Sequence, residues 1–240
     1  MRAADGTQLI AVADGHGSAR CYRAAYGAEM AVRTALDVLQ RHMPSLSGHG
    51  LAPGAEDPIG GDLVEAWRRM VQDHFAVHPV GSLPDDGDPA HDDVFTAYGT
   101  TVLAAAASQE TLRIVQVGDG VALIASTAQG PWRPMPKDPR LAADMTTSLA
   151  LVDAEQYLHQ AVVDLRRQPT DLVVLATDGY TNAFTDDAAF DQVGSDLLRW
   201  LGAQDPERLP DELPVWLGHS ADVTGDDASM ALLYRWPQPA

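Results

Sequence analysis

Aspartates at the ends of apolar stretches are the residues of this chain whose types and spacing could carry chemistry. Three stretches rich in β-type apolar residues end in aspartate and glycine: AVADGHGS at 11–18, IVQVGDG at 114–120 and LVVLATDG at 172–179. A fourth pair, Asp226 and Asp227, lies just before the apolar segment at 228–234. A rigid strand end holds a carboxylate in place, while a neighbouring glycine lets a cation or a phosphate approach the backbone.

Such carboxylates would repel one another at close range unless hard cations lay between them. Mg²⁺ and Mn²⁺ favour oxygen ligands and retain several waters, so they suit this arrangement. A single Asp-Gly pair at a strand end is more often ordinary turn chemistry. Four such instances in one chain weaken that alternative and favour a shared cation site.

The composition bounds the class of protein. With 240 residues, 45% of them hydrophobic, the chain is long enough to bury a large core, and we expect one domain over residues 1–240. The formal net charge of −18 repels phosphate backbones and anionic lipid surfaces, so neither nucleic acid nor a membrane is an expected partner. The single cysteine, Cys21, cannot form an intramolecular disulfide, and residues 1–240 show neither a signal peptide nor a membrane-spanning run. We therefore expect a cytoplasmic monomer.

Hydrophobic periodicity predicts the first elements of the chain. Residues 7–13 read as a short strand that ends at the first aspartate motif. Residues 18–40 read as a helix with Ser18 as its N-cap. Residues 63–75 have the spacing of an amphipathic helix, with Trp67 in the core.

Two stretches, near 44–61 and 79–96, have the composition of loops, and we expect them to be variable. The acidic run at 85–88 lacks the spacing and the bidentate glutamate of a calcium loop, so it reads as a solvated acidic loop. Arg20 and Arg23 are conceivable phosphate clamps, but a solvated helix face is the favoured interpretation.

Short connections predict an antiparallel sheet in the second half of the chain. Candidate strands at 98–107, 111–117 and 121–126 are joined by three residues each, which favours hairpins or a meander. The remaining elements are a strand pair at 160–165 and 171–177, a helix at 188–201, a proline-punctuated segment at 206–217 and a final strand at 229–236. Strands and helices alternate in blocks, which indicates an α+β fold.

Five motifs, taken together and in order, resemble those of the metal-dependent type 2C (PPM-type) serine/threonine protein phosphatases. They are Asp14-Gly15-His16-Gly17, Gly99-Thr100-Thr101, Gly118-Asp119-Gly120, Asp178-Gly179 with Asn182, and Asp226-Asp227-Ala228-Ser229. The resemblance spans about residues 7 to 235 and is greatest to the compact bacterial branch of the family.

The resemblance implies a central sandwich of two antiparallel sheets flanked by helices, in αββα layers, with a binuclear Mn²⁺ or Mg²⁺ site at one end. In that site Asp14 would bridge the two metals, and the Gly15 carbonyl would help to hold one of them through water. Asp178 and Asp226 would bind the other metal. Asp119 matches the position associated with a third, weaker metal.

The resemblance assigns catalysis to His16 together with Asp14. His16 matches the histidine that serves as general acid to the leaving alkoxide, and its unperturbed pKa of about 6.5 suits that task. The alternative is a strand-end histidine bound to a local carbonyl. The other histidines have no metal-ligand spacing, so surface or core roles are expected for them. Gly99-Thr100-Thr101 would supply no ligand and would support the metal-bearing loops.

One departure from the family concerns the N-terminus. Family members begin with an additional strand that brings an acidic metal ligand and often an arginine for the substrate phosphate. Asp5 is a poor substitute, because it lies in the turn before a strand that leads away from it for roughly 23 Å. Either the N-terminal strand is missing, or the chain is a short variant whose metal site is weakened, and we favour a missing strand. In both cases the first metal would lack a ligand, and a missing strand would leave the edge along residues 7–13 unpaired. An upstream extension is expected to raise stability and manganese affinity.

The leading functional hypothesis is metal-dependent hydrolysis of phosphoserine and phosphothreonine on proteins by metal-activated water, in opposition to a serine/threonine kinase. A second hypothesis is a pseudophosphatase, a regulatory binding module with a weakened metal site. A third is a hydrolase of small phosphate monoesters.

Overall fold

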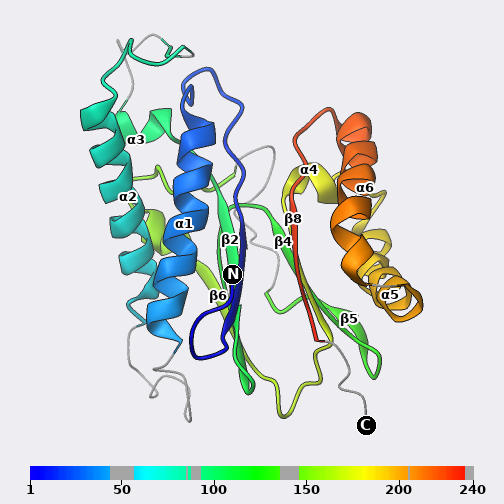
Figure 1. Cartoon of the computed structure of the whole chain (residues 1–240). Helices are drawn as coiled ribbons and strands as arrows, with labels where there is room; N and C mark the ends of the chain where they lie inside the picture. The colour runs from blue at the N-terminus through cyan, green and yellow to red at the C-terminus, as the bar shows by residue number, and fades with distance from the viewer. Residues whose placement is uncertain (44–56, 85, 88–92, 136–145, 205, 236–240) are drawn as a thin grey trace.

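Two antiparallel sheets stack face to face, and helices cover the outer face of each (Figure 1). The computed structural model describes residues 1–43, 57–84, 86–87, 93–135, 146–204 and 206–235. The expected α+β architecture of αββα layers is confirmed. Among the described residues, no helix combines the length and the apolar character needed to cross a membrane.

Each sheet has four strands. The first sheet has the order β1-β2-β3-β6, formed by Gln8–Val12, Val102–Ala107, Thr111–Val117 and His159–Asp164. The second has the order β5-β4-β7-β8, formed by Gly130–Trp132, Val121–Ser126, Leu172–Ala176 and Met230–Tyr234.

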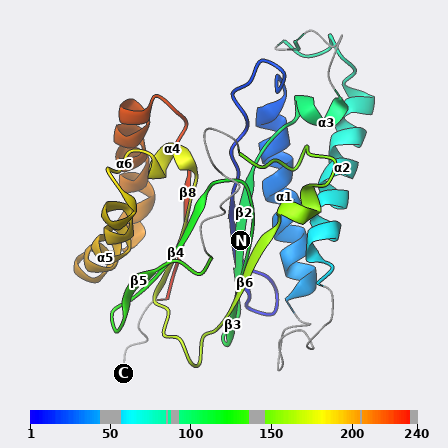
Figure 2. The ribbon, with the colours of Figure 1, turned by 180° about the vertical axis from the view of Figure 1, so that it is seen from behind.

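Helices α1 (Ala24–His42) and α2 (Ile59–Val77) lie on the first sheet, whereas α5 (Asp187–Ala203) and α6 (Leu209–Thr224) lie on the second, as both views show (Figures 1 and 2). Four shorter helical segments complete the described chain: α3 (Val94–Ala97), α4 (Asp178–Thr181), η3 (Ala154–Tyr157) and η4 (Pro206–Arg208).

The apolar strands are buried on both faces. In β7, Val173 and Leu175 point into the core between the sheets, whereas Leu172 and Val174 pack against the helices of the second sheet. The period of two explains why such a strand is a continuous apolar run rather than an alternating one. Trp67 of α2 is fully buried between the helices and the first sheet, as predicted.

The expected meander is wrong at its second connection. β2 and β3 pair, but β3 and β4 belong to different sheets, so residues 118–120 carry the chain from one sheet to the other. The pairing expected between 160–165 and 171–177 is also wrong. β6 pairs with β3, and β7 pairs with β4 and β8, because a sandwich lets consecutive strands join different sheets.

Several elements differ from the prediction. α2 begins at Ile59, inside the stretch 44–61 that was expected to be a loop, α3 lies inside the expected loop at 79–96, and β2 begins at Val102 rather than at 98. α1 begins at Ala24 rather than Ser18, and the Ser18 hydroxyl accepts from the Arg20 amide in the turn before the helix. α6 occupies a segment predicted as proline-punctuated. Pro210 lies in the first turn, where its missing N–H costs nothing, and Pro214 is accommodated within the helix.

The edge of β1 is partly paired, contrary to expectation. The Leu9 amide donates to the Met1 carbonyl at 2.9 Å, and the Ala3 amide donates to the Thr7 carbonyl at 2.8 Å. Gly6, at φ 87°, provides the left-handed turn that lets residues 1–3 fold back.

Asp86, expected in a solvated acidic loop, is buried instead. The Asp86 side chain is only 3% exposed and accepts from Arg23 through both carboxylate oxygens, at 2.6 and 2.8 Å. Asp85 and Asp88 lie outside the described residues, as do 44–56 of the first expected loop.

Candidate metal centre

Four segments bring aspartates to one end of the sandwich. Asp14 follows β1, Asp119 lies in the connection from β3 to β4, Asp178 opens α4 directly after β7, and Asp226 lies between α6 and β8. The strand registers place these ends together, since Val12 pairs with Leu103 next to the start of β2, and Ala176 pairs with both Val121 and Met230.

Three of these carboxylates form a cluster. Asp14, Asp178 and Asp226 each offer a carboxylate oxygen, and these oxygens lie within 4.8 Å of one another. Asp14 and Asp178 are half-buried, whereas Asp226 is exposed. A group of closely spaced, partly desolvated carboxylate oxygens is a donor set that fits a hard divalent cation.

The electrostatics of Asp14 supports this fit. Burial, a hydrogen bond with Asp178 and the negative charges of Asp178, Asp226 and Asp119 raise the pKa of Asp14 to about 8. Without a cation, the site holds a proton where an isolated aspartate would be ionised at neutral pH. A divalent cation can take the place of that proton, because it removes the repulsion that raises the pKa.

Asp119 lies beside the cluster rather than in it. Burial is the main cause of its raised pKa, and the charges of Asp178 and Asp226 add to it, while a hydrogen bond from Thr146 acts in the opposite direction. The charges of Asp178 and Asp226 therefore act on Asp119, although Asp119 does not belong to the group of three carboxylates.

His16 packs next to the cluster. Its amide donates to the Gly99 carbonyl at 3.0 Å, and a Cβ at Gly99 would come within 2.9 Å of His16 Cδ2. Glycine at position 99 therefore makes room for the imidazole. Burial lowers the pKa of His16, and the charge of Asp178 partly offsets this effect.

Gly15 has similarly little space. It pairs with Thr100 in an isolated antiparallel bridge, and a Cβ at Gly15 would meet the backbone of Ala24 at 2.9 Å. The segment from Asp14 to His16 is therefore held between residues 99–101 on one side and the start of α1 on the other.

Residues 99–101 support the Asp14 loop, as predicted. The Thr101 amide and the Thr100 hydroxyl both donate to the Asp14 carbonyl, each at 2.8 Å. The Asp14 amide donates to the Thr101 hydroxyl at 3.0 Å.

Asp178 and Asp226 are held by polar residues that sequence reasoning partly missed. The Asn182 side-chain amide donates to Asp178 Oδ2 at 3.4 Å, in line with its place in the motif. The Thr224 hydroxyl accepts from the Asp226 amide at 3.3 Å and contacts the Gly179 carbonyl at 3.2 Å. Thr224 lies two residues before Asp226, a spacing typical of a local hydroxyl-to-backbone bond and the signal that could have identified it.

Neither arginine near the first motif lies on a solvated helix face. Arg20 is exposed in the turn before α1. Arg23 is 1% exposed and binds Asp86, the Tyr98 hydroxyl and the His78 carbonyl. Among the other described histidines, His42 contacts Asp62 and His74 contacts Tyr98, and none joins the carboxylate cluster.

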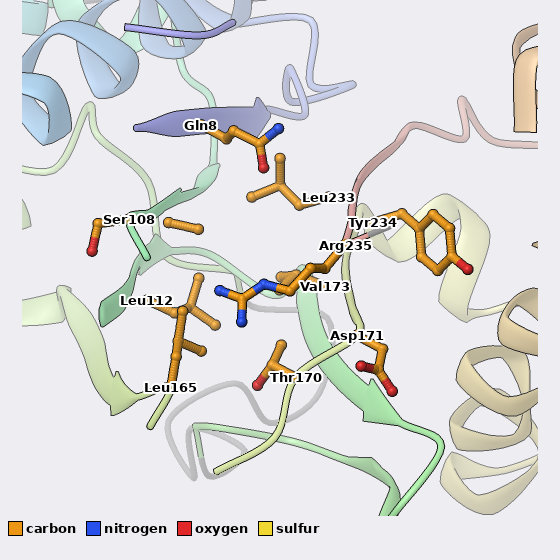
Figure 3. A pocket seen from close by; sticks show the side chains of 11 residues that line it. Gln8, Ser108, Leu112, Leu165, Thr170, Asp171, Val173, Leu233, Tyr234 and Arg235 are labelled. Carbon is orange, nitrogen blue, oxygen red and sulfur yellow. The ribbon is translucent and has the colours of Figure 1, made fainter. Parts of the chain in front are cut away.

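A small pocket lies at the opposite end of the sandwich (Figure 3). Its volume is about 40 Å³, and its lining includes Gln8, Thr170 and Arg235. The Arg235 side chain lies across apolar residues from both sheets, including Leu112 and Leu233 (Figure 3). This end of the sandwich carries none of the three clustered carboxylates.

Solved structures share the fold at low sequence identity. A bacterial serine phosphatase matches with a TM-score of 0.58 and 16% identity, over 98% of this chain and 89% of that chain. Stp1 of Staphylococcus aureus, a serine/threonine phosphatase, matches with a TM-score of 0.57 and 15% identity, over 97% and 85%. The catalytic domain of the serine/threonine protein phosphatase PstP, in complex with two manganese ions, matches with a TM-score of 0.53 and 15% identity, over 94% and 86%.

No curated protein sequence matches the chain. The family model described as protein phosphatase 2C matches residues 1–218. This match covers most of the chain, including the segments that carry Asp14, Asp119 and Asp178, and the fold agrees with it: the chain belongs to the protein phosphatase 2C family.

Proposed function

We propose that this chain hydrolyses phosphoserine and phosphothreonine on proteins with the help of two Mn²⁺ or Mg²⁺ ions. The observation that carries the proposal is the cluster of Asp14, Asp178 and Asp226, because its oxygens lie within 4.8 Å of one another in a chain of the protein phosphatase 2C family. The two manganese ions in the complex of PstP support the same assignment by analogy.

The proposed roles follow the motif positions. Asp14 would bridge the two ions, the Gly15 carbonyl would help to hold one through water, and Asp178 and Asp226 would hold the other. Asp119 would serve a third, weaker site. When bound, the ions lower the pKa of a water and neutralise charge on the phosphate oxygens.

His16 would donate a proton to the oxygen of the leaving serine or threonine. Its pKa is lowered by burial, so the neutral imidazole prevails without substrate at neutral pH. A phosphate dianion next to His16 would raise that pKa and favour the protonated form that a general acid needs. The His16 amide donates a hydrogen bond to the Gly99 carbonyl, and the imidazole lies against Gly99 within reach of the charge of Asp178.

The substrate would be a phosphoprotein produced by a serine/threonine kinase, and the enzyme would act as a cytoplasmic monomer.

A second candidate function is a regulatory module that binds a cation without turnover. It is favoured by the small size of the cluster, since only three carboxylates of the described residues meet in it. Hydrolysis of small phosphate monoesters is a third candidate that the same carboxylates permit.

Hydrolysis of p-nitrophenyl phosphate tests the proposal directly. We expect turnover with Mn²⁺, none with EDTA, and a loss of about 100-fold or more for Asp178→Asn, because this change removes one ligand charge. Asp211→Asn is the matched control, since Asp211 is exposed in the first turn of α6, at the other end of that helix from Asp226. A folded wild-type protein without manganese-dependent turnover would exclude both hydrolase hypotheses and leave the regulatory module.

Phosphopeptides separate the two hydrolase hypotheses. A protein phosphatase should have a higher kcat/KM for phosphoserine peptides than for small alkyl phosphates. His16→Asn in the same assay should slow the phosphoserine peptide about 10²-fold and p-nitrophenyl phosphate much less, because nitrophenolate leaves without a proton donor. Equal losses on both substrates would contradict the general-acid role.

A further inference from the structure

Thr101 contacts two of the segments that carry aspartates, although it supplies no charge. We propose that Thr101 is a positioning residue that sets the geometry of Asp14 through its hydroxyl and that of Asp119 through its methyl group. This inference rests on the proposed cation site but not on turnover.

The hydroxyl and amide of Thr101 hold both backbone groups of Asp14. The Asp14 amide donates to Thr101 Oγ1 at 3.0 Å, and the Asp14 carbonyl accepts from the Thr101 amide at 2.8 Å. The amide-to-carbonyl bond continues the pairing of β1 with β2 beyond the last residue of β1, and the Thr101 hydroxyl takes the place of a backbone acceptor for the Asp14 amide. The Thr100 hydroxyl also donates to the Asp14 carbonyl at 2.8 Å, but among the described residues the Asp14 amide has only Thr101 Oγ1 as its acceptor. Because the Cα–Cβ direction follows from the backbone, these bonds together orient the Asp14 carboxylate.

The methyl group of Thr101 faces the β3–β4 connection. An added Cβ at Gly118 would lie only 2.5 Å from both Cβ and Cγ2 of Thr101. Gly118 has φ 111°, a conformation that favours glycine, and its amide donates to the Thr147 hydroxyl at 2.9 Å. The residue directly before Asp119 is therefore packed onto Thr101, and the turn that presents Asp119 rests on this side chain.

The two roles need two different parts of one side chain. Valine would keep the shape but leave the Asp14 amide without its acceptor, whereas serine would keep the acceptor and remove the methyl group under Gly118. Thr101 is 6% exposed, so water does not readily replace the lost acceptor. Thr101→Val should thus affect Asp14, and Thr101→Ser should affect mainly Asp119.

Thr170→Val is the matched control for a role that is merely structural. Thr170 is 8% exposed, and its hydroxyl donates to the Gln168 carbonyl at 3.2 Å. It lines the pocket at the opposite end of the sandwich (Figure 3), so the same chemical change occurs far from the carboxylates.

The experiment measures Mn²⁺ binding by calorimetry and, in the metal-free protein, hydrogen exchange of the Asp14 amide by NMR. For Thr101→Val we expect manganese affinity to fall about tenfold and Asp14 exchange to accelerate, as the loss of one buried hydrogen bond predicts. Thr101→Ser should keep the Asp14 amide protected, and Thr170→Val should change neither reading. Wild-type affinity and protection in Thr101→Val, or equal losses in Thr170→Val, would overturn the inference.

A second variant decides the case if Thr101→Val does not fold. Gly118→Ala places a methyl group against Thr101 at a φ that disfavours alanine. This variant should bind manganese more weakly than the wild type while the protein stays folded. Wild-type manganese affinity in this variant would overturn the inference. Neither the manganese affinity nor the hydrogen exchange of the Asp14 amide depends on catalysis. A wild-type protein that binds Mn²⁺ without hydrolysing phosphoesters would refute the proposed function while leaving the role of Thr101 open to the same measurements.

Discussion

Under the proposed function, a proton and a divalent cation would compete for Asp14. The folded protein raises the pKa of Asp14 from 3.8 to about 8, chiefly through burial and the neighbouring Asp178. The folded state therefore holds a proton that the unfolded state releases above pH 4. The stability that comes from this proton is fully present below the unfolded pKa and is lost as the pH rises toward 8.

We predict that the melting temperature of the metal-free protein falls between pH 5 and pH 8, in part because of Asp14. After allowance for solvent screening at this half-buried site, the Asp14 contribution should be about 1–2 kcal/mol, or about 2–8 °C. Thermal melts in EDTA at several pH values would measure it. Other groups titrate in this range too, so the informative quantity is the difference between the wild type and Asp14→Asn.

Thermal melts at the same pH values with saturating Mn²⁺ measure how much the cation stabilises the protein at each pH. Because the cation replaces the proton, stabilisation by manganese should grow as the pH rises. An Asp14→Asn variant with the pH dependence of the wild type would show that Asp14 does not hold the proton.

At the residue scale, the sequence predicts the clustered carboxylates better than it predicts the residues that support them. Asp14, Asp178 and Asp226 were found because each follows or precedes an apolar run and a glycine lies close by, and the structure brings these three together. Thr224 was missed because a hydroxyl near a turn is common and reveals its partner only in three dimensions. The resemblance assigns Asp119 to a third, weaker site apart from the other three, and in the structure it lies beside their cluster.

At the scale of elements, one buried ion pair joins Asp86, in the segment between α2 and α3, to the start of α1. Arg23 is 1% and Asp86 3% exposed, and the pair is bidentate. The guanidinium also donates to the Tyr98 hydroxyl at 2.8 Å, one residue before Gly99. This link lies beside the residues that hold Asp14 and His16, so it couples a surface loop to the support of the site.

We predict that removing either partner of this pair destabilises the protein strongly. Arg23→Met and Asp86→Asn should each lower the melting temperature by about 5–15 °C, because each leaves a polar group buried without its partner. Arg33→Met is the matched control, since Arg33 pairs with Glu29 at the surface with both side chains more than half exposed. That change should shift the melting temperature by about 2 °C or less.

The double variant tests whether the two residues act as a unit. If they do, Arg23→Met with Asp86→Asn should cost much less than the sum of the single changes. Additive losses would contradict a direct coupling between the two side chains.

Strands were easier to predict than the route of the chain between them. β3 and β4 were predicted at their observed bounds because both are apolar and end at glycine or serine. A connection of three residues can form a hairpin within one sheet or can lead to the facing sheet. The two routes differ in whether the strand after the connection lies in the same sheet, which the spacing along the sequence does not show. The predictions for Arg23 and α6 failed for related reasons: an arginine near a helix start is usually solvated, and prolines usually end helices.

At the scale of the whole molecule, the net charge of −18 acts on everything that approaches the site. The acidic cluster at one end of the sandwich adds to this field locally. Such a field attracts divalent cations and positively charged peptide segments and repels small anions. It falls off within about 10 Å at 0.1 M salt and within about 30 Å at 0.01 M salt.

We therefore predict opposite salt dependences for two kinds of substrate at saturating Mn²⁺. For a phosphoserine peptide flanked by several lysines and arginines, kcat/KM should fall about three- to tenfold between about 20 and 200 mM NaCl, because screening weakens its attraction to the protein. For p-nitrophenyl phosphate, which is an anion, kcat/KM should stay constant or rise modestly. Initial rates at substrate concentrations well below KM give this quantity directly.

A peptide of the same length with glutamine in place of the basic residues separates steering by charge from a general effect of salt on the enzyme. If the whole-molecule field guides the encounter, this peptide should start with a lower kcat/KM at low salt and converge with the basic peptide at high salt. Parallel losses for both peptides would instead mean that salt acts on the cation site itself. In that case the acidity of the chain would serve its solubility rather than its choice of substrate.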